Sequence, residues 1–161
     1  MINKLLGVIC AVVLGVDVCM AQSDGSQNIT NWGESVHGVQ LSVELNTNVI
    51  IAGTWSVLHC RITNASATDS AYFVKEPAHD FDISLIDNSG KNFELMSNPS
   101  GNPGSLVVLE LKPGKTLERS IPIKVDKSVK PGNYTLKTEA SVEITDGAYA
   151  LDANLLKVQI E

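Results

Sequence analysis

The sequence predicts an all-β protein, an antiparallel β-sandwich of about eight or nine strands. Three observations predict it. Apolar and polar residues alternate with a period of two in one segment after another, and turns that contain Gly or Pro separate these segments. No segment after residue 21 repeats apolar residues at the i, i+3 and i+4 positions of an amphipathic helix. The connections are also short, which permits antiparallel pairing but leaves no room for parallel crossovers.

The first 21 residues are typical of a secretory signal peptide. Lys4 gives a positive start, residues 5–16 form an apolar run, and Cys19 and Ala21 place small residues at the −3 and −1 positions of a cleavage site. The run is too short to cross a bilayer, so we expect no transmembrane span. Neither Cys of this segment follows a small residue, which makes a lipid anchor the weaker alternative. We therefore predict cleavage after Ala21 and an exported product, periplasmic or extracellular.

The predicted product divides into a polar leader and one domain. Residues 22–34 are rich in Ser, Asp, Gly, Gln and Asn, which predicts a flexible leader with order beginning near Trp32. Residues 35–161 form the predicted domain. Cleavage removes Cys10 and Cys19 and leaves Cys60 alone, so no intramolecular disulfide is expected. The domain must then be stable through its core.

The first half of the domain contains five predicted strands. Residues 37–46 alternate strictly, with Val39 and Leu41 among the inward positions. The other strands of this half are expected at residues 54–64, 71–76, 80–87 and 91–97. In the strand at residues 54–64, the side chains of Leu58, Cys60 and Ile62 face inward. Asn88, Ser89 and Gly90 make a hairpin turn between the last two.

The second half contains four more predicted strands. They are expected at residues 105–111, 116–125, 133–145 and 148–160, after a loop at residues 98–104 that holds two prolines and two glycines. Pro122 marks an edge or a bulge, because proline cannot donate to a ladder. The alternation is most regular in residues 133–145. Asp146 and Gly147 then form a tight hairpin turn.

Residues 130–136 read Lys-Pro-Gly-Asn-Tyr-Thr-Leu and resemble the corner of immunoglobulin-like domains, where a Tyr at a strand start bonds back upstream. Tyr134 would have that structural role. The wider order resembles secreted bacterial immunoglobulin-like domains and is similar to the BsuPI-type proteinase inhibitor domain. The segments that carry it are residues 61–66, 82–91, 111–114 and this corner, and the similarity spans residues 54–142. It implies an immunoglobulin-like β-sandwich. No inhibitory residue carries over, and the Trp32-Gly33 leader and the Pro/Gly loop depart from such domains.

The composition argues against nucleic acid as a partner. The 12 basic and 18 acidic side chains give a net charge of −6, so the chain has no broad basic footprint for a phosphate backbone. We expect a monomer. A hydrophobic share of 43% and a charged share of 19% suit one soluble domain.

The motifs of common enzymes do not occur in the sequence. No Gly-Xaa-Ser-Xaa-Gly elbow, phosphate-binding loop or zinc-protease motif is present. His59 adjoins Cys60, but neighbours on a strand face opposite ways and cannot form a catalytic pair. We interpret Cys60 as a buried, inert structural thiol, with an intermolecular disulfide as the alternative. We therefore predict that the protein is not an enzyme.

Metal and cofactor sites are not predicted either. His37, His59 and His79 fall on separate segments without ligand spacing. His79, Asp80 and Asp82 are the one local grouping that calcium could use, but the Asp87 turn lacks the later Glu of an EF-hand. We expect no cofactor.

Three Asn residues begin glycosylation sequons. They are Asn28, Asn64 and Asn133, and they would accept glycans only in a eukaryotic secretory pathway. We favour a bacterial source, in which such Asn residues serve turns.

Binding through loops remains the favoured function. A sandwich presents its end loops to partners, and two loops stand out as candidate partner-binding sites. The residues concerned are Glu76, Pro77, His79 and Asp80 in the first loop, and Asn98, Pro99, Asn102 and Pro103 in the second. We predict an exported module that recognises a protein or a cell-envelope component. The alternatives are a BsuPI-like proteinase inhibitor, loops that merely connect strands, and, remotely, an envelope enzyme with a polar cluster near His79.

Overall fold

The computed structural model describes residues 31–75, 81–97 and 107–161, and these residues contain twelve β-strands and no helix. The prediction of an all-β sandwich is confirmed. The strands are β1 (Val39–Leu45), β2 (Val49–Ile50), β3 (Trp55–Asn64), β4 (Ala71–Lys75), β5 (Asp82–Ile86), β6 (Asn92–Glu94), β7 (Met96–Ser97), β8 (Val107–Leu111), β9 (Thr116–Lys124), β10 (Gly132–Ile144), β11 (Gly147–Asp152) and β12 (Leu156–Ile160).

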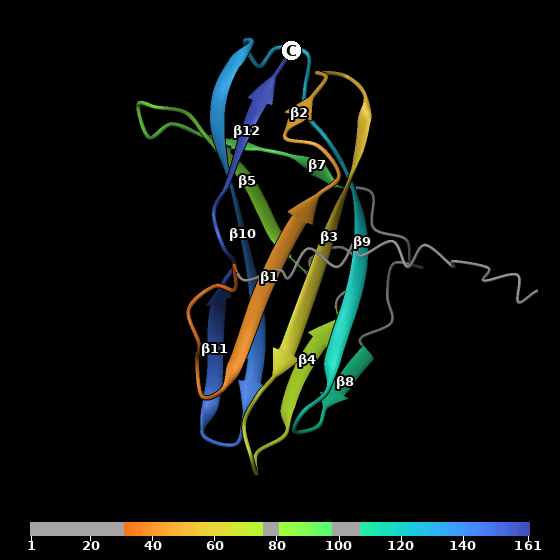
Figure 1. The fold of residues 1–161 in the computed structure, drawn as a ribbon, viewed down its shortest axis with the longest axis vertical. Coiled ribbons are helices and arrows are strands. Elements are labelled where there is room, and N and C mark those ends of the chain that lie inside the picture. Colours follow the sequence, from red (N-terminus) through yellow and green to blue (C-terminus); the bar gives the residue numbers. More distant parts are fainter. Residues whose placement is uncertain (1–30, 76–80, 98–106) are drawn as a thin grey trace, which may run out of the picture.

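Two sheets make up the sandwich. The first, sheet A, has the order β1-β3-β9-β7, and the second, sheet B, is built around β10. In sheet B, β12 and β11 pair with β10, as do β5 and β4, while β6, β8 and β2 lie further out. Figure 1 shows β1, β3 and β9 in front of β10 and β5. The order β1-β3-β9-β7 facing β12-β10-β5-β6 is the A-B-E-D and G-F-C-C′ arrangement of immunoglobulin-like sandwiches.

The strand count exceeds the predicted eight or nine because two predicted strands are each divided into two and because β2 was not predicted. Residues 91–97 were expected to form one strand, but β6 pairs with β5 in sheet B and β7 pairs with β9 in sheet A. Residues 148–160 divide into β11 and β12, which both stay in sheet B and pair with different parts of β10. The short β2 was not predicted, and its parallel pairing with β12 is the exception to an otherwise antiparallel set of described pairs. Local alternation does not reveal which partner a strand takes.

The core lies between the inner faces of the two sheets. The inward residues predicted on β3, Leu58, Cys60 and Ile62, are all buried. Leu85 of β5 and Leu136 of β10 meet them from sheet B and are fully buried as well. The same alternation that predicts a strand therefore also identifies its buried face.

Residues 31–34 and the side chain of Asn154 cover the free edge of β1. The N–H of Gly33 donates to the carbonyl oxygen of Leu41 at 2.8 Å. The side chain of Asn154 binds Val43 twice, with the Val43 N–H donating to Oδ1 at 2.7 Å and Nδ2 donating to the Val43 carbonyl at 3.1 Å. These contacts satisfy backbone groups that an edge strand would leave open. Residues 31–34 of the predicted leader thus lie against β1, while residues 22–30 lie outside the described residues.

The corner expected from the sequence is present. The hydroxyl of Tyr134 donates to the carbonyl oxygen of Lys130 at 2.8 Å, and the Tyr134 side chain is buried at the start of β10. Phe93 of β6 packs edge-on against its ring. The hydrogen bond and the packing together hold the turn that leads into β10.

No helix among the described residues has the length and apolar character needed to cross a membrane. The predicted signal peptide, residues 1–21, lies outside the described residues.

Candidate functional site

The outer face of sheet A carries the most distinctive side chains of the described surface. Because Leu58, Cys60 and Ile62 of β3 point into the core, the alternate residues from Trp55 to Thr63 point outward. β9 follows the same rule, and its register places each outward residue of β9 beside one of β3. The outward pairs divide this face into a polar half and an apolar half.

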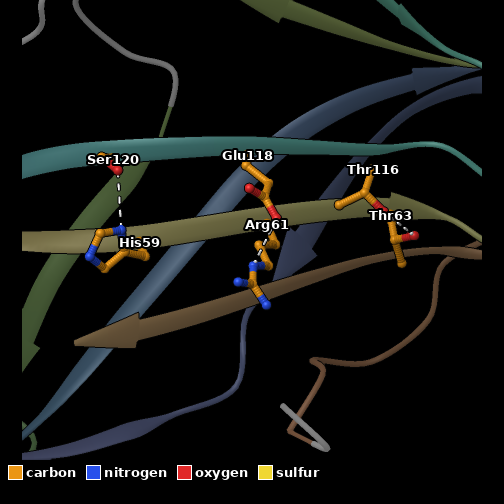
Figure 2. A network of polar contacts seen from close by, with 6 residues as sticks. All are labelled: His59, Arg61, Thr63, Thr116, Glu118 and Ser120. Atoms are coloured by element: carbon orange, nitrogen blue, oxygen red, sulfur yellow. Dashed lines mark hydrogen bonds and ion pairs between the residues drawn. The ribbon is translucent and has the colours of Figure 1, made fainter. Parts of the chain in front are cut away.

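The polar half consists of three successive cross-strand pairs between β3 and β9 (Figure 2). His59 Nδ1 lies 3.1 Å from Ser120 Oγ, and Thr63 Oγ1 lies 3.1 Å from Thr116 Oγ1. Between them, Arg61 Nε and Glu118 Oε1 form an ion pair at 3.1 Å. We call these six residues the polar ladder. Exposed pairs of this kind each contribute roughly 0.2–1 kcal/mol, so the ladder supports the sheet only modestly.

The apolar half begins at the next pair. Val57 lies opposite Pro122, and Trp55 lies opposite Lys124, which in turn lies opposite Met96 of β7. The side chains of Trp55, Val57 and Met96 are 51%, 40% and 56% exposed. We call Trp55, Val57, Met96 and Pro122 the Trp55 patch. It spans three adjacent strands, so its apolar side chains form a group rather than isolated exposures.

Lys124 adds a charge to the patch. Its ammonium lies 5.7 Å from the centroid of the Trp55 ring, within the range of a cation–π contact. The stem of Lys124 shares the outer face with Trp55 and Met96 through the register of the three strands. The patch therefore offers apolar contact together with one cation.

The sequence contained a signal for this site that the prediction did not use. Once Leu58, Cys60 and Ile62 are inward, strict alternation places Trp55 and Val57 on the solvent side of the same strand. Met96 could not be found in this way, because its place beside Lys124 depends on the change of sheets after β6.

The predicted partner-binding loops cannot be compared with this surface. Glu76, Pro77, His79 and Asp80 lie outside the described residues, as do Asn98, Pro99, Asn102 and Pro103. The polar cluster considered near His79 falls in the same gap.

The two neighbours His59 and Cys60 face opposite sides of sheet A, as expected. Cys60 is buried, and burial raises the pKa of its thiol to about 12. A thiol that keeps its proton at neutral pH is a poor nucleophile. His59 contacts Ser120 on the open face, and no described carboxylate forms an ion pair with it. The described residues thus bring no nucleophile, base and orienting group together.

The described residues also form no group of three His, Cys, Asp or Glu that could hold a metal ion. Asp87 serves its turn: its carboxylate accepts hydrogen bonds from the Ser89 side chain and from the N–H groups of Ser89 and Lys91. These bonds, the Ser89 side chain first, lower the pKa of Asp87.

The sequon residues have unequal surroundings. Asn64 is fully buried, and its amide donates to the carbonyl oxygens of Asp69 and Leu111 at 2.7 and 2.8 Å. An enzyme could not reach this amide without unfolding the end of β3. Asn133 is exposed at the start of β10, and Asn28 lies outside the described residues. Asn64 therefore has a structural role in organising a turn.

Comparisons with known proteins describe the fold. No family model matches the chain, and no curated protein matches it. Among solved structures the chain is similar to Spo0M, the sporulation control protein of Bacillus subtilis, with a TM-score of 0.52 and 9% sequence identity. That match covers 78% of this chain and 50% of Spo0M, so the chain spans about half the length of Spo0M.

A second similar structure is the PapD-like domain 7 of human CEP192, with a TM-score of 0.36, 15% identity and coverage of 74% of this chain and 84% of that one. At such identities a likeness concerns the fold alone. Together with the strand order, the likeness to Spo0M describes the chain as an all-β, immunoglobulin-like sandwich.

Proposed function

We propose that this chain is an exported, non-enzymatic binding module that recognises a protein through the Trp55 patch. The observation that carries the proposal is the contiguous exposure of Trp55, Val57 and Met96 across three strands of sheet A. Trp and Met are enriched in the buried centres of protein interfaces, and a few such side chains supply most of the binding energy. The proposed binding surface is thus a sheet face, in place of the end loops that the sequence predicted.

The surroundings of the patch suit an interface. A protein-binding surface combines an apolar centre with a polar, hydrogen-bonding rim. The polar ladder adjoins the patch directly, because the His59–Ser120 pair follows the Val57–Pro122 pair along the same two strands. Both halves stand on paired strands, so little backbone conformational entropy is lost when a partner binds.

The test is affinity capture from the envelope and secreted fractions of the source organism with three forms of the purified chain. One is the natural chain, one carries Trp55→Glu with Met96→Glu, and one carries Val108→Glu. Val108 is a matched control because it is 53% exposed on β8 of sheet B. We expect a specific protein that the natural chain and the Val108 variant retain and that the double variant loses. Equal retention by all three forms, or no retained protein, would contradict the proposal.

The alternative is a proteinase inhibitor similar to the BsuPI type. It is supported by the order of the strand and turn segments between residues 54 and 142. Replacement of residues 102–105 with a neutral linker is expected to abolish inhibition if that loop occupies a protease cleft. Unchanged inhibitory potency after the replacement would count against the loop, and absence of inhibition by the natural chain would count against the function itself.

A further inference from the structure

A shallow pocket of about 270 Å³ lies at one end of the sandwich, on the outer face of sheet B, whereas the Trp55 patch lies on the outer face of sheet A. It is lined by four segments that are far apart in the sequence: the β1–β2 connection, the β5–β6 turn, the start of β10 and the end of β12. In Figure 1 this is the end at which the C-terminus is marked. The polar lining residues are Asn48, Asn88, Asn133, Thr135, Lys157 and Gln159.

The framework of the pocket is held by regular structure. Asn133 pairs with Gln159 and Thr135 pairs with Lys157 across β10 and β12, so these four side chains form a platform on two adjacent strands. The intervening pair, Tyr134 and Val158, is buried beneath them.

Asn48 and Asn88, the other two polar residues of the lining, lie in segments that are anchored by backbone and turn hydrogen bonds. The N–H of Gln159 donates to the carbonyl oxygen of Asn48 at 2.7 Å. Asn88 belongs to the turn that Asp87 holds with its carboxylate, and Gly90 N–H donates to the Asp87 carbonyl at 3.0 Å. The backbone of the lining residues is therefore in place before any ligand arrives, so that binding orders side chains but no loop.

The lining combines one cation with several amides. Lys157 Nζ donates to Thr135 Oγ1 at 2.7 Å, and an ammonium keeps two further N–H donors. The side-chain amides of Asn48, Asn88 and Asn133 form no hydrogen bond with any described residue, and each offers donors and an acceptor. No Asp or Glu belongs to the lining, although the chain as a whole has a net charge of −6.

We propose that this pocket binds a carboxylated sugar, with Lys157 facing the carboxylate and the Asn amides facing the hydroxyl groups. An ammonium pairs with a carboxylate, and amides that both donate and accept match hydroxyls that do the same. The volume falls just below the roughly 300 Å³ at which pockets for drug-sized ligands begin, which suits one sugar ring. The site is separate from the Trp55 patch, so it does not depend on the proposed protein partner.

The experiment follows the backbone amide resonances of the isotope-labelled chain during titration with D-glucuronate, D-glucose and acetate, each as its own series. We expect glucuronate to shift the resonances of Asn133, Thr135, Lys157 and Gln159 with saturation in the millimolar range. Glucose lacks the charge and acetate lacks the hydroxyls, so both should bind at least about tenfold more weakly. Equal shifts from all three compounds, or glucuronate shifts outside the pocket, would overturn the proposal.

Three variants assign the binding to the lining. Lys157→Met keeps the length of the side chain but removes the charge, and we expect it to reduce glucuronate affinity about tenfold or more. Asn133→Asp adds a charge that repels the carboxylate and should do the same. Lys112→Met removes an exposed lysine in the β8–β9 turn and should leave affinity unchanged. Unchanged glucuronate binding by Lys157→Met would overturn the assignment.

Discussion

At the scale of single residues, Tyr134 combines two kinds of stabilisation. Its ring is buried against Phe93, and its hydroxyl reaches the Lys130 carbonyl within the turn before β10. Removing the hydroxyl leaves that carbonyl without its partner and keeps the packing almost unchanged.

We expect Tyr134→Phe to lower the free energy of unfolding by about 1 kcal/mol or more. Urea denaturation followed by circular dichroism measures this loss. Tyr72→Phe is the matched control, because Tyr72 is partly exposed on β4 and its hydroxyl forms no hydrogen bond with a described residue. If both variants were as stable as the natural chain, the Tyr134 hydroxyl would contribute nothing and the residue would stabilise the fold by packing alone.

Cys60 predicts a pH dependence of stability. Burial holds the folded pKa of the thiol at about 12, against an ordinary value of 9.0 in the unfolded chain. Between these values the unfolded state has lost the proton and the folded state keeps it, so this group lowers stability as the pH rises above about 9. Below pH 9 both states hold the proton and the group has no effect.

The expected result is a difference between the natural chain and Cys60→Ala. Both lose stability in alkali through their other groups, but the natural chain should lose it more steeply above pH 9. The extra slope of its unfolding free energy against pH corresponds to about one proton released on unfolding. Denaturation midpoints measured from pH 8 to pH 10.5 give the two slopes. Parallel curves would mean that Cys60 is accessible in the folded state, and rapid labelling by a thiol reagent at pH 8 would show the same.

At the scale of elements, the sequence predicted most strands and the two hairpins β5–β6 and β10–β11, but it did not predict the other pairings. Period-two alternation identified the core faces of β1, β3 and β10, because burial alternates along a strand whatever its neighbour is. It could not divide residues 91–97, since Leu95 lies between strands of different sheets. It also gave no sign of β2, whose two residues are too few to show a period. Partner choice depends on register and loop geometry across the whole molecule.

The same limit applies to the candidate sites. The alternation of β3 would have placed Trp55 and Val57 outward, although the prediction did not use it, while Met96 and the pocket around Lys157 required the pairing of distant strands. The partner-binding loops were predicted from their composition, and composition does not show which side chains share a surface.

The side chain of Asn154 protects the edge of β1 at Val43. Its side chain replaces a neighbouring strand for Val43, with one hydrogen bond in each direction. We expect Asn154→Ala to expose the Val43 amide and to speed its hydrogen exchange about tenfold or more, with little change at Cys60, which lies inside sheet A. Asn92→Ala on β6 is the control. An unchanged exchange rate at Val43 would show that other groups protect the edge.

At the scale of the whole molecule, the segment around Gly33 joins the two sheets. The N–H of Gly33 bonds Leu41 of sheet A, and a side-chain carbon added at Gly33 would lie 1.8 Å from the carbonyl oxygen of Asp152 in sheet B. No real Cβ tolerates such an approach to backbone. Only glycine allows the chain to pass between β1 and β11.

We therefore expect Gly33→Ala to displace this segment while the sandwich stays folded. Limited proteolysis should cut residues 31–36 faster in the variant than in the natural chain, and the thermal midpoint should fall by several degrees. Gly90→Ala is a control for loss of a glycine, because nothing lies within 4 Å of the added carbon, although its positive φ of 83° adds local strain. Equal cleavage of residues 31–36 in the natural chain and Gly33→Ala would contradict the model of a tightly held crossing.

The pairing of β2 with β12 bears on when the molecule can fold. Residues 49 and 50 lie beside residues 159 and 160, and the Ala52 N–H donates to the Glu161 carbonyl. Partners separated by about 110 positions make closure of this sheet a late and slow event, because a long loop must be ordered first. During synthesis the β2 edge stays unpaired until residue 161 has left the ribosome. For the proposed export this delay would be useful, because translocation requires a chain that has not yet completed its fold.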